Sequence, residues 1–153
     1  MEALRQKRGF TMIEILVSIA ILVTFTAVTM VAFRNVYRHS GERIAVQEIA
    51  DALRESRNKS IGSIQDMVFG VRIATSSVTR FVGSTYSATS TSNTVYYFEG
   101  GATATGTLVR NATSIVFSRL LGTPSATGTI LVRDIDNQST TTITIVQTGL
   151  IEY

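Results

Sequence analysis

Cysteine is absent from the 153-residue chain, and proline and histidine occur once each, at Pro124 and His39. Without cysteine the protein has no disulfide, no thiol nucleophile and no cysteine-ligated zinc site. The lone histidine lacks visible partners for a Ser/His/Asp site or a metal cluster, and a solvated side chain explains it better. No glycine-rich phosphate loop follows a predicted strand. The sequence therefore predicts no enzyme: no catalytic residue, no metal site and no cofactor.

Two acids, Asp134 and Asp136, have the spacing of a calcium loop. The glycine and the distal glutamate that such a loop requires do not follow them. A β-turn around Asp136-Asn137 is the preferred interpretation.

Charged residues make up only 16% of the chain, and the net charge is +3. Three basic residues and one acid lie within residues 1–9, so removing this segment lowers the net charge to +1. From Ser63 onward, five arginines balance five acids. The basic character thus belongs to the N-terminal part of the chain, and nucleic-acid binding by the remainder is not favoured.

One long hydrophobic run, residues 10–33, contains Glu14 as its only charged residue. As a helix it is about 36 Å long, enough to cross a hydrocarbon core of about 30 Å. A secretory signal cleaved near Ser18-Ile19-Ala20 is the main rival, but it would leave a hydrophobic new terminus. The run predicts a single membrane-spanning helix. Basic residues flank it on both sides, so charge alone does not orient it.

Residues 34–62 show helical periodicity. Val46, Ile49, Ala50 and Leu53 recur at three- and four-residue spacing, and charged residues that include Glu42 are assigned to the other faces. The apolar stripe is expected to pack on a sheet. Ser40-Gly41 is a predicted weak point because glycine costs roughly 1 kcal/mol inside a helix.

From residue 63 to residue 153 the pattern changes to short β-branched and aromatic runs, separated by Ser, Thr and Gly. Hairpins are expected at Thr148-Gly149 and near Asp136, and a loop is expected over residues 85–94. The predicted strands are 67–73, 79–82, 94–98, 107–110, 114–118, 129–133, 141–146 and 150–153. The fold class is therefore α+β, with one long N-terminal helix packed against an antiparallel β head.

Glu14 needs a physical explanation, because an ionised carboxylate in a membrane span costs about 2.5–3.5 kcal/mol. It lies four residues after Phe10, about 6 Å further along a helix. Cleavage between Gly9 and Phe10 would create an α-amino group that Glu14 of the same or a neighbouring chain could neutralise. Such a pair would fix the register of assembling helices. The alternative is a carboxylate at the membrane interface without a specific role.

The string Lys7-Arg8-Gly9-Phe10-Thr11-Met12-Ile13-Glu14 resembles the prepilin motif of type IV pilins and type II secretion pseudopilins. The resemblance implies cleavage after Gly9 by prepilin peptidase, N-methylation of Phe10 and an assembly contact between Glu14 and the Phe10 amine. It also implies four segments: leader 1–9, transmembrane helix 10–33, amphipathic continuation 34–62 and head 63–153. The N-terminus would then be cytoplasmic, the span would lie in the inner membrane, and the head would be periplasmic or extracellular.

Residues 49–58 and 68–71 resemble the minor pseudopilin H and FimT-like group. Many major pilins have a proline in the spanning helix and a C-terminal cysteine pair, which this chain lacks. The resemblance implies a minor subunit that initiates a filament or lies at its tip. Its implied partners are prepilin peptidase, other pilin or pseudopilin subunits, the inner-membrane assembly platform and membrane lipid. The alternatives are a FimT-like subunit that binds DNA for transformation and an unprocessed anchor of an enzyme head.

Overall fold

The computed structural model describes residues 10–136 and 139–153, and only the backbone of residues 31–39. The leader 1–9, with Gly9, lies outside the described residues, as do Asn137 of the predicted turn and the side chain of His39. The chain divides into two compact units, Met1–Val36 and Tyr37–Tyr153, which are described separately.

A single helix, α1 (Met12–Ile61), runs through the boundary between the two units. Its C-terminal end agrees with the predicted one. The helix also continues through Ser40 and Gly41, where the sequence predicted a weak point.

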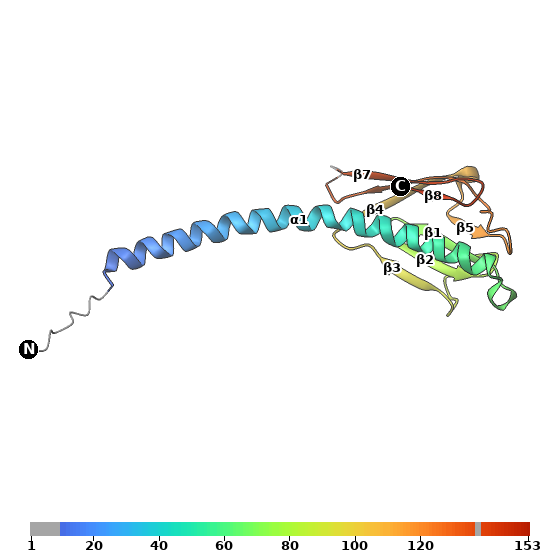
Figure 1. The fold of residues 1–153 in the computed structure, drawn as a ribbon, viewed down its shortest axis with the longest axis horizontal. Helices are drawn as coiled ribbons and strands as arrows, with labels where there is room; N and C mark the ends of the chain where they lie inside the picture. Colours follow the sequence, from blue (N-terminus) through green and yellow to red (C-terminus); the bar gives the residue numbers. More distant parts are fainter. Residues whose placement is uncertain (1–9, 137–138) are drawn as a thin grey trace, which may run out of the picture. The chain divides into compact units, whose positions relative to one another are not determined.

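The rest of the second unit is built mainly from β-strands (Figure 1). Sheet A has the strand order β3-β2-β1-β5, and sheet B has the order β4-β6-β7-β8. All neighbouring strands in both sheets are antiparallel, which confirms the α+β prediction. The strands are β1 (Phe69–Ala74), β2 (Ser77–Val82), β3 (Thr94–Tyr97), β4 (Thr103–Leu108), β5 (Ser114–Phe117), β6 (Gly128–Arg133), β7 (Thr140–Ile145) and β8 (Ile151–Glu152). Two 3-10 turns, η1 (Ile64–Asp66) and η2 (Val109–Asn111), complete the described elements.

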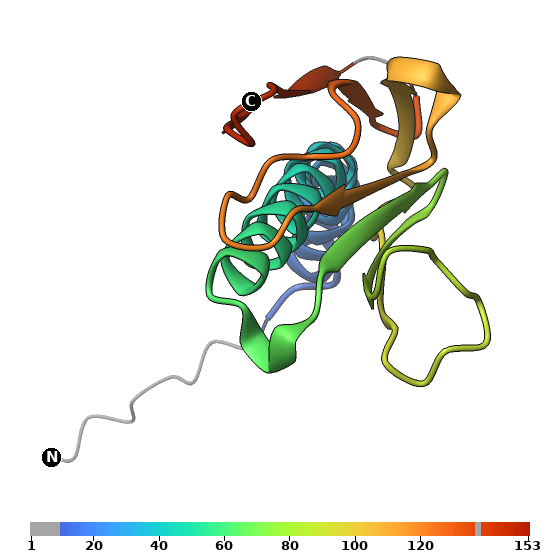
Figure 2. The same ribbon diagram turned by 90° about the vertical axis from the view of Figure 1, so that its right-hand side faces the viewer.

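The part of α1 in the second unit lies against both sheets (Figures 1 and 2). Its buried side chains include the predicted Val46, Ile49, Ala50 and Leu53. They belong to one core cluster with residues from sheet A and from sheet B. The predicted apolar stripe is therefore the helical side of the core. The sheet residues of this cluster include Val71 and Ile115 from sheet A and Ile130, Ile143 and Ile145 from sheet B.

The predicted hairpin at Thr148-Gly149 is confirmed. The N–H of Gly149 donates to the carbonyl of Val146 at 2.9 Å, and Ile145 pairs with Ile151 across the two strands. Gly149 has a φ of +79°, a conformation that glycine adopts without a steric penalty.

The assignment of Glu42 to a polar face was wrong, because this side chain is only 3% exposed. A Cβ atom on the preceding Gly41 would lie 2.8 Å from the carbonyl oxygen of Glu99. The segment after β3 therefore lies directly on this turn of the helix and covers it. The glycine that looked like a helix weak point permits this close approach.

The fourth strand was placed wrongly. The sequence predicted residues 107–110, but β4 is Thr103–Leu108, and η2 follows it. Its inward side chains include the small residue Ala104, and Gly106 interrupts the β-branched pattern. At Arg110 the backbone reaches a φ of +63°, which ends the extended conformation.

Candidate functional site at the first turn of the N-terminal helix

Thr11 and Glu14 cap the start of α1. The backbone N–H of Glu14 donates to the Thr11 hydroxyl at 3.4 Å, and the backbone N–H of Thr11 donates to Glu14 Oε2 at 3.4 Å. This reciprocal arrangement is a capping box, in which each of the two side chains accepts a backbone N–H of the first turn. The Glu14 N–H also donates to the Thr11 carbonyl at 3.1 Å. The motif Thr-x-x-Glu thus has a local structural role in addition to the predicted assembly contact. Its spacing, a known helix-start signal, could have revealed this role in the sequence.

The capping box holds the Glu14 carboxylate close to the residue that follows the predicted cleavage site. Phe10 directly precedes Thr11, whose N–H the carboxylate accepts. The phenylalanine side chain is 81% exposed. The structure therefore brings Phe10 and Glu14 to the same end of the helix, where the helix dipole also favours a negative group. Gly9, the third predicted site residue, lies outside the described residues.

The helix that follows this turn is long and apolar enough to cross a membrane, from Met12 to Met30. None of that window is buried within the protein. Large exposed patches of this kind on a protein surface indicate contact with lipid or with another apolar surface. The helix is consistent with membrane anchoring through the N-terminal part of the chain.

The hydroxyl groups of this segment are satisfied within the helix itself. Each donates to a backbone carbonyl of the preceding turn, as in Ser18 to Glu14 at 2.7 Å and Thr26 to Leu22 at 2.7 Å. Thr24 and Thr29 do the same. Such back-bonding is a common way to place a hydroxyl in an apolar helix.

Several basic side chains of the second unit lie in ion pairs. Lys59 Nζ is 2.8 Å from Glu55 Oε1, and Arg119 Nη2 is 2.7 Å from Asp66 Oδ1. Arg80 also pairs with Glu55. These acids reduce the positive charge that this unit presents, in agreement with the balanced charge count. Among residues 10–136 and 139–153, no group of three or more His, Asp or Glu side chains is placed to hold a metal ion.

Comparison with known proteins gives one finding. Residues 4–30 match the family model described as the prokaryotic N-terminal methylation motif. The match supports a type IV pilin-like precursor that is processed by prepilin peptidase, and the motif belongs to proteins of structural rather than enzymatic function. Neither the search of curated proteins nor the search of solved structures gave a significant match.

Proposed function

We propose that this protein is a minor pilin or pseudopilin, a structural subunit of a type IV pilus-like or type II secretion filament. Prepilin peptidase cleaves it between Gly9 and Phe10, and Phe10 becomes the methylated first residue. The mature chain then consists of the span 10–33, its continuation 34–62 and the head 63–153. The subunit initiates the filament or lies at its tip.

The capping box carries this proposal. It keeps the Glu14 carboxylate within one turn of Phe10, so the amine created by cleavage appears beside a negative group. In a low-dielectric environment an unpaired carboxylate is costly, and pairing with an amine removes much of that cost. A Phe10 amine from an adjacent subunit offers the same relief. The contact then favours one axial register between neighbouring helices.

The proposed setting rests on the resemblance of the N-terminal motif to prepilins and on the apolar span. The N-terminus faces the cytoplasm, where the peptidase and the assembly platform act, and the head lies in the periplasm or outside the cell. The exposed apolar side chains from Met12 to Met30 contact lipid before assembly and the helices of other subunits afterwards.

Two measurements test the cleavage motif and the Glu14 contact: mass spectrometry of the mature chain, and the amount of the chain that is incorporated into filaments. The native host should yield a chain that begins at methylated Phe10. Glu14→Ala should still be cleaved but should enter filaments at about a tenth of the native level or less, since it leaves the desolvated Phe10 amine without its counter-charge, at a cost of several kcal/mol. Ser18→Ala is the matched control, because the Ser18 hydroxyl bonds to a carbonyl of its own helix.

Two results would contradict the proposal at different points. A mature chain that retains Met1 would exclude processing and would favour an ordinary membrane anchor. Normal incorporation of a cleaved Glu14→Ala chain would exclude the register contact and leave processing intact.

A further inference from the structure

Sheet A has an outer face, which points away from the core, and Arg72 of β1 lies on it. Both neighbours of Arg72 in β1 belong to the core, so the side chain between them points to the opposite face. Arg72 pairs with Thr79, and Thr79 pairs with Val95, so these three side chains share the outer face. Tyr97, two residues after Val95 in β3, lies on the same face. Figure 2 shows the segment 83–93, in yellow-green, on this side of the sheet and α1 on the other side.

A stack of side chains holds the segment 83–93 on the outer face. The ring of Phe81 lies over Gly70, where a Cβ atom would overlap it. Phe81 meets the ring of Tyr86 edge-on, with 5.5 Å between the two ring centroids. The Tyr86 ring in turn lies 4.5 Å from the guanidinium carbon of Arg72. Tyr86 is therefore fixed between a buried aromatic ring and a cation.

Hydrogen bonds within the segment order the rest of it. The side-chain amide of Asn93 donates to the Ser87 carbonyl at 2.7 Å, and the Ser90 N–H donates to the same carbonyl at 3.3 Å. The hydroxyls of Ser87 and Thr89 are 3.1 Å apart. Tyrosine, serine and asparagine on an ordered loop are typical of recognition loops, because they combine rigid aromatic area with adaptable hydrogen-bonding groups.

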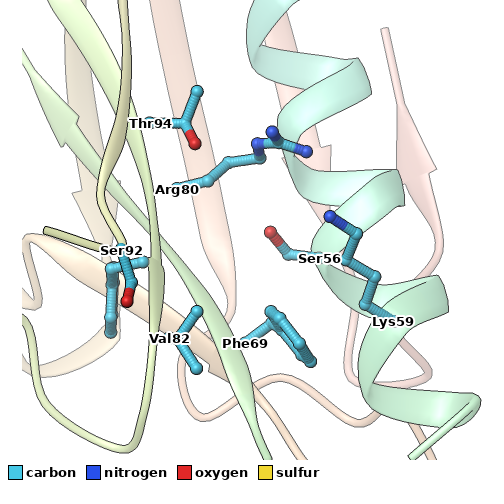
Figure 3. A pocket seen from close by; sticks show the side chains of 8 residues that line it. Ser56, Lys59, Phe69, Arg80, Val82, Ser92 and Thr94 are labelled. Atoms are coloured by element: carbon cyan, nitrogen blue, oxygen red, sulfur yellow. The ribbon is translucent and has the colours of Figure 1, made fainter. Parts of the chain in front are cut away.

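Arg72 differs from the other cations that contact aromatic rings. Arg54, Lys59 and Arg80 each also pair with a carboxylate of α1. Figure 3 shows the side chain of Arg80 directed towards α1. Arg72 has no acidic partner and no hydrogen-bond acceptor among the side chains that the structure describes, and none of its nitrogen atoms is buried without a partner. Its N–H donors are therefore accessible at the surface.

The surroundings of Arg72 indicate an acidic protein segment as the partner. Among the outward side chains of sheet A and of the segment 83–93, all of which are described, Arg72 is the only charged one. A nucleic-acid backbone would require several cations. A guanidinium group that is stacked on a ring keeps its planar edge free, and this edge fits the two oxygens of one carboxylate. Val95 is 42% exposed and Tyr97 is 72% exposed, so apolar and aromatic area lies beside this cation, as in protein-binding hot spots.

We propose that the outer face of sheet A binds a segment of a partner protein that carries an aspartate or glutamate near an apolar side chain. The carboxylate binds the guanidinium group of Arg72, and the apolar side chain packs on Val95 and Tyr97. Val95 is two strands away from Arg72, roughly 10 Å, which about three residues of an extended segment span. Tyr86 is a positioning residue that keeps the guanidinium group in place. The surface uses no residue of the N-terminal motif, so it does not depend on the proposed filament function.

The test uses the full chain in nonionic detergent micelles and two probe peptides, acetyl-Glu-Ala-Ala-Leu-amide and its glutamine analogue. NMR signals of the Arg72 guanidinium group and of the β2 and β3 backbone amides report binding. The glutamate peptide should bind in a saturable way and about threefold or more tighter than the glutamine peptide, because it gains a charge-assisted hydrogen bond. Arg72→Gln should remove this difference. Arg133→Gln, at an exposed position of β6 in sheet B, is the matched control and should keep it.

Tyr97→Thr keeps a residue suited to a strand and removes the aromatic ring, so it decides the question if Arg72→Gln fails to fold. It should weaken the binding of both peptides by a similar factor, about threefold or more. The absence of saturable binding, equal affinity of the native chain for the two peptides, or native behaviour of both folded variants would overturn the proposal. Tighter binding of an oligothymidylate at the same residues would indicate a nucleic-acid site. Shifts that grow with protein concentration without peptide would indicate a second copy of this chain, and either result would also overturn the proposal.

Discussion

Glu48 is a half-buried acid on α1, and one of its carboxylate oxygens, Oε2, has no hydrogen-bond partner in the described part of the chain. Burial raises its pKa above the ordinary 4.5, and the nearby charge of Glu99 raises it further. The folded protein therefore holds the Glu48 proton more tightly than the unfolded chain does. This contribution to stability is complete below pH 4.5 and is lost as the pH rises through the folded pKa.

Glu48→Gln should consequently be more stable than the native protein at pH 7 and should lose this advantage towards pH 4. Glutamine keeps the shape of the side chain and cannot ionise, so it avoids the unfavourable charge. The measurement is the melting temperature of both proteins between pH 4 and pH 7.

Asp51→Asn is the control for this experiment, because the Asp51 side chain is 77% exposed on the same helix. Its stability difference from the native protein should change less with pH. A Glu48→Gln difference that does not vary with pH would contradict the effect of burial on the Glu48 pKa.

The positions of individual site residues could be predicted from the sequence, but their structural roles could not. Glu14 was identified as a candidate site residue because it is the only charged residue in the apolar run of residues 10–33. The burial of Glu42 could not be predicted, since tertiary packing around this turn includes a segment more than fifty residues away that lies against the neighbouring Gly41. Local periodicity contains no information on such contacts.

At the level of secondary-structure elements, Ser60 links the C-terminal end of α1 to sheet A by a side-chain hydrogen bond. Ser60 is fully buried, and its hydroxyl oxygen accepts the backbone N–H of Phe69 at 3.0 Å, at the first residue of β1. The backbone carbonyl of Ser60 accepts the N–H of Leu120 at 3.2 Å. The helix end therefore has partners in both the strand that follows it and the loop after β5.

Ser60→Ala should destabilise the protein by about 1–3 kcal/mol, because it leaves the partly buried Phe69 N–H without its acceptor. Chemical denaturation of the full chain in detergent measures this free energy. Ser63→Ala is the matched control, since the Ser63 hydroxyl makes a long, exposed contact of 3.4 Å with Arg119. Equal stability of the two variants would show that the Ser60 contact is not important for the helix end.

Most elements were predictable because their local pattern agrees with their final environment. The strands with alternating large side chains, such as β1 and β7, lie close to their predicted bounds. Strand β4 was misplaced because alanine and glycine interrupt its β-branched pattern, and its pairing with β6 is a long-range contact. The division of the strands into two sheets could not be predicted either, because strand order depends on such long-range pairings and not on local β-propensity.

At the level of the whole molecule, both sheets pack against the same apolar face of α1 and share one core with it. Leu53 and Ile49 are fully buried in the cluster that contains residues of both sheets. The two sheets also approach each other through β1 and β4. Because both sheets depend on the same helical side chains, they should lose stability together.

Leu53→Ala should destabilise the second unit by about 2–5 kcal/mol, the typical range for removing a buried leucine side chain. Native-state hydrogen exchange should show the same loss of protection for amides of β1 and of β6. Ile44→Ala, at a position that is 37% exposed on the same helix, is the control and should cost less. Loss of protection in one sheet alone would mean that the sheets unfold independently.

The hydroxyls of the apolar helix have a consequence for movement between environments. Ser18, Thr24, Thr26 and Thr29 each donate to a carbonyl of their own helix, so none of them requires water, lipid or a neighbouring helix as a partner. The helix makes the same set of hydrogen bonds when acyl chains surround it as when other apolar helices do. In the proposed filament function, transfer of this helix from the bilayer to a bundle of subunit helices would therefore break none of these hydroxyl hydrogen bonds.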